Sequence, residues 1–134
     1  MDAEIITTGT EILLGEIVDT NAAWMARRLR DLGINLFYKT TVGDNLDRIV
    51  AAMRQGLDRS DLVLVTGGLG PTVDDVTRDA AALATDRELV LDDACLASIE
   101  AIFARWGRKL SDNNRLQAYL PAGSIPVFTP VGTA

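Results

Sequence analysis

The residues best suited to chemistry lie in one glycine-rich segment, Thr66 to Thr72, which follows an apolar run and precedes Asp74 and Asp75. The glycines of this segment would allow its backbone to approach a ligand closely. A helix that starts after the segment would offer unpaired N–H groups to a phosphate. The segment lacks the Gly-Lys-Ser/Thr ending of a Walker A loop and the Gly-x-Gly-x-x-Gly pattern of dinucleotide-binding loops. Spacing alone therefore supports a ligand site and a plain tight turn about equally.

The aspartates have a structural and a functional interpretation. In the first turn of a helix, carboxylates are stabilised by the helix dipole, and Thr72 with Asp75 resembles a capping box. A carboxylate beside bound phosphate could instead hold Mg²⁺ or activate water. We favour the structural role for Asp74. Asp44 follows another predicted strand, so it is either a helix cap or a second carboxylate of the same site.

Four further side chains are weaker candidates. Glu11 follows Thr8 to Thr10 in a strand-end loop, where a carboxylate is either solvated or functional. Asn21 is expected in the first turn of a helix, from which its amide could reach a ligand. Arg78 could pair with phosphate, although we expect a surface role for it. Cys95 lies on an apolar helix face, which indicates a buried and inert thiol.

Composition excludes several kinds of function. The chain has no histidine, which excludes Ser-His-Asp catalysis and His-ligated zinc. The groups that remain available for chemistry are carboxylates, hydroxyls, backbone amides and a bound hard cation. Its single cysteine excludes an intrachain disulfide. The net charge of −6, without a long Lys/Arg cluster, argues against nucleic acid as a partner. No segment has the pattern of a signal peptide or a membrane span, so we expect a cytoplasmic protein without a membrane partner.

Strand and helix patterns alternate along the chain of 134 residues. The predicted strands cover residues 3–7, 34–42 and 61–66, with a last one at 124–129. Residues 88–91 form either a short strand or an extended connector. The predicted helices cover residues 20–32, 46–57, 74–84, 92–106 and 113–120. This alternation predicts one α/β domain with three α/β/α layers and a mostly parallel sheet covered on both faces. Ligands of such sheets bind beyond the carboxyl ends of the strands, where the candidate loops lie.

Several sequence blocks, in order and over nearly the whole chain, resemble the amino-terminal domain of the CinA (competence/damage-inducible protein) family. The blocks are Gly9-Thr-Glu-Ile-Leu-Leu-Gly15, Ile17-Val-Asp-Thr-Asn21, Thr41-Val-Gly-Asp-Asn45, Thr66-Gly-Gly-Leu-Gly-Pro-Thr72, Asp74-Asp-Val-Thr77, Asn113 to Pro121 and Pro130-Val-Gly-Thr-Ala134. The resemblance implies the molybdopterin-binding (MoaB/Mog-like) fold. In the family, the closing block continues into Pro-Gly and a further strand. The resemblance therefore implies a single domain, residues 1–134, that is truncated at its carboxyl end.

The resemblance also implies an activity. The CinA branch is associated with divalent-metal-dependent hydrolysis of the ADP-ribose pyrophosphate, and whole CinA proteins add a nicotinamide mononucleotide deamidase domain. In the Mog branch the same loop binds molybdopterin and supports its adenylylation. We therefore expect an ADP-ribose pyrophosphatase-type hydrolase. Molybdopterin binding or adenylylation, and a domain that only binds its ligand, are the alternatives.

The site residues follow from the resemblance and the loops together. Asp44 and Asp75 match the catalytic aspartates of the Mog branch, and with Glu11 they are the expected ligands of Mg²⁺ or Co²⁺. The expected partners are a small anionic nucleotide or pterin and a second copy of the chain, with a trimer as the alternative to a homodimer. The residues expected to bind the ligand are Thr8, Gly9, Glu11, Asn21, Thr66, Gly67, Gly68, Leu69, Gly70, Pro71 and Thr72.

Overall fold

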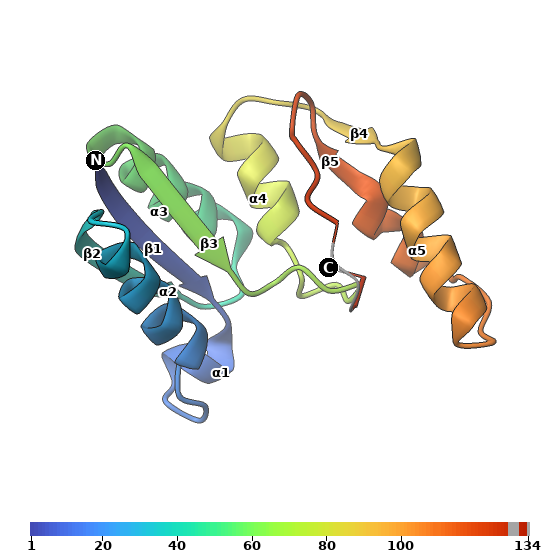
Figure 1. Cartoon of the computed structure of the whole chain (residues 1–134), viewed down its shortest axis with the longest axis horizontal. Coiled ribbons are helices and arrows are strands. Elements are labelled where there is room, and N and C mark those ends of the chain that lie inside the picture. Colours follow the sequence, from blue (N-terminus) through green and yellow to red (C-terminus); the bar gives the residue numbers. More distant parts are fainter. Residues whose placement is uncertain (129–131, 134) are drawn as a thin grey trace.

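The computed structural model describes residues 1–128 and 132–133. A parallel sheet with the strand order β2-β1-β3 forms the centre of the amino-terminal half (Figure 1). Its strands are β1 (Asp2–Thr8), β2 (Asn35–Val42) and β3 (Leu62–Thr66). Thr8 pairs with Val42 and Thr7 with Thr66, so all three strands end at the same edge. The predicted parallel sheet is confirmed, with each strand end within one residue of its expected place.

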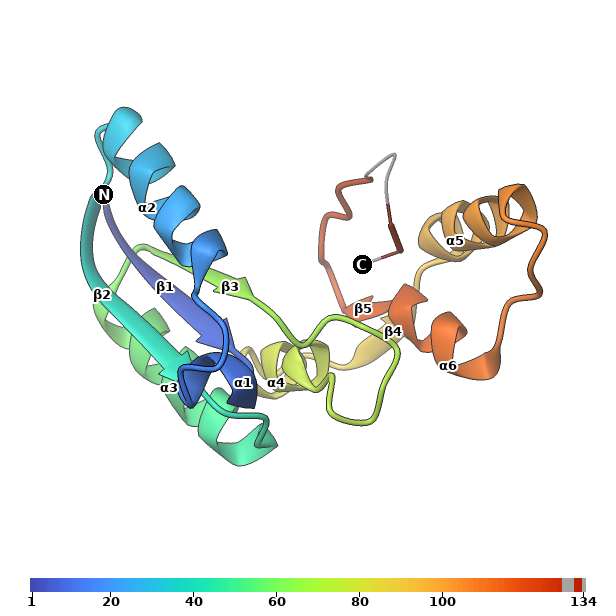
Figure 2. The same ribbon diagram turned by 90° about the horizontal axis from the view of Figure 1, so that it is seen from below.

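Helices cover both faces of this sheet, as Figure 2 shows for α2 and α3. The helices of this half are α1 (Thr10–Leu13), α2 (Thr20–Asp31), α3 (Leu46–Arg59) and α4 (Thr77–Ala84). Neighbouring side chains of β1 point to opposite faces, so Ile5 packs with Leu29 of α2 while Ile6 packs with Ile49 of α3. Ile5 and Ile6 are both fully buried. The three-layer α/β architecture is confirmed.

Side-chain caps begin both α2 and α3. Asp19 accepts a hydrogen bond of 2.9 Å from the Ala22 N–H at the start of α2. Asn45 accepts one of 3.1 Å from the Arg48 N–H at the start of α3. Asn45 is therefore the cap of α3, and the carboxylate of Asp44, which the sequence left open as a helix cap, is engaged elsewhere.

A buried ion pair links β1 to the end of α3. Glu4 is 1% exposed, and its carboxylate accepts two hydrogen bonds of 2.9 Å from the Arg59 guanidinium and one of 2.9 Å from the Thr40 hydroxyl. The guanidinium also lies 3.5 Å from the ring centre of Tyr38. The hydrogen bonds from Arg59 hold the pKa of Glu4 below its ordinary value; burial opposes this, and Thr40 adds to it.

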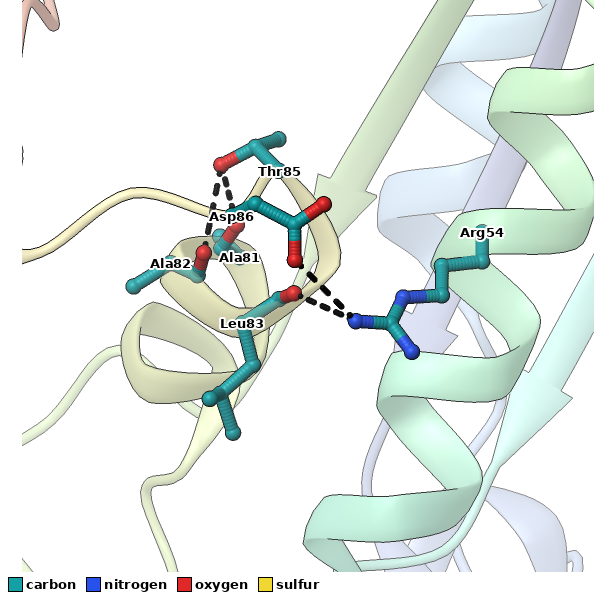
Figure 3. A network of polar contacts seen from close by, with 6 residues as sticks. All are labelled: Arg54, Ala81, Ala82, Leu83, Thr85 and Asp86. Carbon is teal, nitrogen blue, oxygen red and sulfur yellow. Dashed lines mark hydrogen bonds and ion pairs between the residues drawn. The ribbon is translucent and has the colours of Figure 1, made fainter.

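Arg54 connects α3 to the carboxyl end of α4, as Figure 3 shows. Its guanidinium donates a hydrogen bond of 2.9 Å to the carbonyl oxygen of Leu83 and lies 3.5 Å from a carboxylate oxygen of Asp86. A cation at this end of a helix satisfies a free carbonyl and complements the helix dipole. This contact orients α4, whose opposite end begins at the glycine-rich loop.

The carboxyl-terminal half contains an antiparallel pair of strands, of which the sequence pattern allowed the first, at residues 88–91, but did not predict the second. It consists of β4 (Leu89–Leu91), α5 (Asp93–Arg105), α6 (Asp112–Arg115), a 3₁₀ helix η1 (Leu116–Ala118) and β5 (Tyr119–Pro121). Leu89 pairs with Pro121, and the pair is separate from the parallel sheet. The helix expected over 113–120 thus ends earlier. Residues 124–128 of the expected last strand have no regular structure, and residue 129 lies outside the described residues.

Two helix starts differ from the sequence prediction, and both lie beside the candidate loops. The short helix α1 was expected to be a loop, because four residues are too few to show a helical period. α4 begins at Thr77 and not at Asp74 or Asp75, since residues 72–75 form a turn in which the Asp75 N–H donates to the Thr72 carbonyl oxygen. None of the helices that the structure describes is long and apolar enough to cross a membrane.

Candidate functional site

The three strand-end loops meet at the carboxyl edge of the parallel sheet. The Gly9 N–H donates a hydrogen bond of 3.0 Å to the Val42 carbonyl oxygen, which ties the end of β1 to that of β2. The Thr8 hydroxyl lies 3.4 Å from the Thr66 carbonyl oxygen at the end of β3. The Asn21 amide nitrogen lies 3.5 Å from the Thr66 hydroxyl. The structure therefore brings these predicted ligand-binding residues together.

Gly67 and Gly68 hold the base of the loop against β1 and α4. Both have positive φ angles, 92° and 61°. A Cβ on Gly67 would collide with the Thr8 carbonyl oxygen, and one on Gly68 with the Thr77 hydroxyl. The hydroxyls of Thr8 and Thr77 form a buried hydrogen bond of 2.9 Å beneath them. Close packing inside the protein is thus sufficient to require these two glycines.

Asp75 is fixed by its own loop. One of its carboxylate oxygens accepts hydrogen bonds of 2.8 Å from the Thr72 N–H and 2.6 Å from the Thr72 hydroxyl. Burial raises the pKa of Asp75, but these hydrogen bonds, one from the Gly70 N–H and the charge of Arg78 together lower it below its usual value. The pairing expected for a capping box exists, but it closes a turn ahead of the helix. It keeps an ionised carboxylate beside the glycine-rich loop.

Asp44 and Glu11 lie at the start of α1. Asp44 accepts a hydrogen bond of 3.1 Å from the Thr10 N–H, and its own N–H donates one of 3.1 Å to the Thr10 hydroxyl. The Glu11 side chain folds back over Gly9, where a Cβ would lie 3.1 Å from a carboxylate oxygen of Glu11. Asp44 thus joins the loops that follow β1 and β2.

The three predicted metal ligands do not form a preassembled cluster. Within residues 1–128 and 132–133, no group of three histidine, cysteine, aspartate or glutamate residues is placed to hold an ion. Asp44 and Asp75 are each already bound by a neighbouring threonine. Their oxygen donors still suit a hard cation such as Mg²⁺, which commonly takes its remaining ligands from water and substrate phosphates.

Thr72 and Asp75 line an open hollow of about 400 Å³. Leu46 at the start of α3 and Tyr119 of β5 form other parts of its wall. Arg78 lines it as well, and its side chain is only 15% exposed. The expected surface role of Arg78 is therefore wrong, because β5 and the residues before it pack beside α4 and cover most of this side chain.

One residue beside the glycine-rich loop, Gln117, was not identified from the sequence. Gln117 is 8% exposed, and its amide donates a hydrogen bond of 3.3 Å to the carbonyl oxygen of Leu69. A glutamine 48 positions away from its partner gives no local signal. The contact anchors the middle of the glycine-rich loop to the carboxyl-terminal half.

Comparison with known proteins gives the family. Residues 4–134 match the family described as a probable molybdopterin binding domain. The crystal structure of the protein CinA from Thermoplasma acidophilum is 40% identical, with a TM-score of 0.90 over 99% of this chain and 78% of that chain. The chain belongs to the CinA branch of this family. The resemblance drawn from the sequence blocks is confirmed.

Further relatives set the length of the matched proteins and the fold. A competence-damage inducible protein of Levilactobacillus brevis is 51% identical over the whole chain, which covers 32% of that relative. The chain thus spans about a third of the length of the curated relatives it matches. The tungsten cofactor synthesizing protein MoaB of Pyrococcus furiosus has a TM-score of 0.60 at 20% identity, over 79% of this chain and 64% of that chain. This likeness shows a shared MoaB-type fold.

Proposed function

We propose that the domain binds a small phosphorylated ligand at the carboxyl edge of the sheet and hydrolyses the pyrophosphate of ADP-ribose or a related nucleoside diphosphate sugar, with Mg²⁺ or Co²⁺ as cofactor. The observation that carries this proposal is the ionised carboxylate of Asp75, held in place by Thr72 beside the glycine-rich loop and facing an open hollow. A fixed anion next to a glycine-rich loop suits the binding of a cation between protein and phosphate.

The roles of the other residues follow from their positions. Backbone N–H groups of the loop, the hydroxyl of Thr66 and the amide of Asn21 lie where they would contact phosphate oxygens. Asp75 and Asp44, with Glu11, would hold the cation. A divalent cation bound there supplies the charge that polarises a phosphoryl oxygen and makes a bound water more acidic. Hydrolysis would form a bond from a water oxygen to one phosphorus and break the bond from that phosphorus to the bridging oxygen. The leaving phosphate would take up a proton lost by the water, and the products would be AMP and ribose 5-phosphate.

A second candidate function rests on the family itself. The family is described as a probable molybdopterin binding domain, and the same loop and hollow would accept the phosphate of a pterin. Adenylylation of that phosphate would then replace hydrolysis. A third candidate is a domain that binds its ligand without turnover. Each candidate gives a different product: AMP from ADP-ribose, adenylylated pterin, or none.

Replacing Asp75 with Asn is expected to lower metal-dependent AMP release by about 100-fold, the scale found when one group that stabilises a charged transition state is removed. Asn keeps the shape and the hydrogen-bond acceptor, so the melting temperature should change little. The assay incubates the full chain with ADP-ribose and Mg²⁺ or Co²⁺ and follows AMP by chromatography. Asp74→Asn is the matched control, since Asp74 is the exposed neighbour on the same turn.

Three results of this assay are informative. Loss of turnover in Asp75→Asn alone supports the hydrolase. Equal activity in Asp75→Asn and the unchanged chain would mean that the assigned role of Asp75 is wrong. Absence of AMP from the unchanged chain, with ADP-ribose still bound in calorimetry, would favour the domain that only binds.

We also propose that the chain forms a homodimer, with a trimer as the alternative. Exposed apolar side chains gather in the segment after α1, where Leu14 is 67%, Ile17 57% and Val18 79% exposed. Apolar side chains exposed side by side favour association. Light scattering of the purified chain gives the mass, and a monomer at micromolar concentration would contradict the proposal.

A further inference from the structure

A second cavity, of about 240 Å³, opens beside the glycine-rich loop. Leu69 of the loop forms one wall, and Ile99 and Ile102 of α5 form another. Leu120 of β5 and Phe128 line it as well. α5 and β5 belong to the half of the molecule next to the loop, as Figure 2 shows. The wall is mostly apolar, and its volume lies just below the range of about 300–1,000 Å³ typical of small-molecule pockets.

Arg78 lies between this cavity and the hollow that contains Asp75, because it lines both. Its Nε atom is buried and has no hydrogen-bond partner in the described part of the chain. The nearest carboxylate, that of Asp79, is 3.8 Å from a terminal guanidinium nitrogen, too far for a hydrogen bond. A buried N–H of a cation without an acceptor is costly, and an anionic ligand would satisfy it.

The cavity also has the few fixed polar groups that orient a ligand in an apolar pocket. Ser98 and Gln117 line it, and Gln117 is held by its hydrogen bond to the carbonyl oxygen of Leu69. The same hydrogen bond fixes the loop at the cavity wall. If the phosphate of a ligand binds at the glycine-rich loop, the group attached to that phosphate would therefore lie at the mouth of the cavity.

We propose that this cavity is the subsite for the planar heterocycle of the ligand, and that Arg78 binds a phosphate oxygen of the same molecule. The inference rests on the proposed function in one respect, the binding of phosphate at the glycine-rich loop. The ligand class is a planar heterocycle that carries a phosphate, either a purine nucleotide or a phosphorylated pterin. The cavity has room for one such ring among its aliphatic side chains, so the second half of a dinucleotide-like substrate lies outside it.

Cys95 allows binding in the cavity to be measured directly. It is the single cysteine of the chain, and its thiol is free and lines the cavity wall. The expected full burial of Cys95 is wrong, because the side chain is partly exposed at this cavity. We expect AMP to slow the reaction of Cys95 with a small maleimide at least tenfold at mildly alkaline pH. Inorganic pyrophosphate, which has no ring, should leave the rate unchanged. A phosphorylated pterin in a third sample shows which of the two heterocycles fits. An unchanged rate with both heterocycles would overturn the proposal.

Arg78→Gln tests the phosphate contact. We expect it to weaken AMP binding in calorimetry about 10- to 100-fold, the loss that follows removal of a hydrogen bond to a charged group. The melting temperature without ligand should stay the same or rise, because a buried N–H without an acceptor is removed. Arg30→Gln is the matched control, since the Arg30 side chain is 75% exposed on α2, away from the site. A lower melting temperature with unchanged AMP binding would mean that Arg78 is only structural.

The two proposals fail separately. Protection of Cys95 by AMP that is lost in Arg78→Gln, together with no hydrolysis of ADP-ribose, would support this subsite and contradict the hydrolase. Hydrolysis that depends on Asp75 but is the same in Arg78→Gln, without protection of Cys95, would support the hydrolase and contradict the subsite.

Discussion

Replacing Arg59 with Met is expected to lower the free energy of unfolding by about 2–4 kcal/mol, because it leaves the carboxylate of Glu4 buried without its cation. The value is at the lower end of the range for broken buried ion pairs, since the Arg59 side chain is 29% exposed and water can partly replace it. Urea unfolding at neutral pH measures the change. A methionine still packs on Tyr38, so the loss reports the charge more than the volume.

The double variant Glu4→Leu with Arg59→Met is the control for this interpretation. It removes both charges, and we expect it to recover more than half of the loss, since an apolar pair avoids the cost of burying an ion. Equal destabilisation in the single and double variants would show that packing, and not the unpaired carboxylate, sets the effect.

The contribution of the ion pair between Glu4 and Arg59 to the free energy of unfolding should decrease as the pH falls. The pKa of Glu4 is lower in the folded chain than its ordinary value of 4.5, so the folded state holds the carboxylate ionised more strongly than the unfolded state does. The stability gained is fully present above pH 4.5 and is lost as the pH falls through the folded-state pKa. The difference in stability between the unchanged chain and Arg59→Met should therefore shrink in acid.

The sequence was sufficient to predict the parallel sheet and its helices because these are specified locally. The run Leu62 to Val65 and the β-branched residues of β2 predict strands to within one residue, and Asn45 caps α3 as its type suggests. β5 could not be predicted, since Tyr119 to Pro121 form a strand only through pairing with residues about thirty positions earlier.

The candidate site was predicted in its loops but not in its details. The sequence indicated Asp75 correctly as a partner of Thr72, but the similarity to a capping box suggested a helix start that the chain does not have. Arg78 was misplaced for another reason: the residues that cover it, among them Tyr119 and Leu120, lie far along the chain, where no local pattern indicates the contact. Gln117 and the pair of Glu4 with Arg59 depend on contacts across many residues, which no local pattern contains.

Replacing Gly67 with Ala is expected to lower the free energy of unfolding by about 2–5 kcal/mol, from two separate causes. The φ angle of 92° is unfavourable for a residue with a side chain, and the new Cβ would collide with the carbonyl oxygen of Thr8. That carbonyl belongs to the last residue of the central strand, which cannot move without disturbing its pairing with β2 and β3. The collision therefore cannot be relieved cheaply.

Gly33→Ala separates the two causes. Gly33 has a similar φ angle of 71°, but a Cβ there would have no heavy atom within 4 Å. Its replacement should therefore cost only the backbone strain, about 1–2 kcal/mol. Urea unfolding of both variants under the same conditions gives the difference, which measures the contact between the glycine-rich loop and β1. Equal losses for Gly67→Ala and Gly33→Ala would mean that the loop does not pack on Thr8. Packing of the loop on β1 would then not explain how Asp75 is held beside the strand ends.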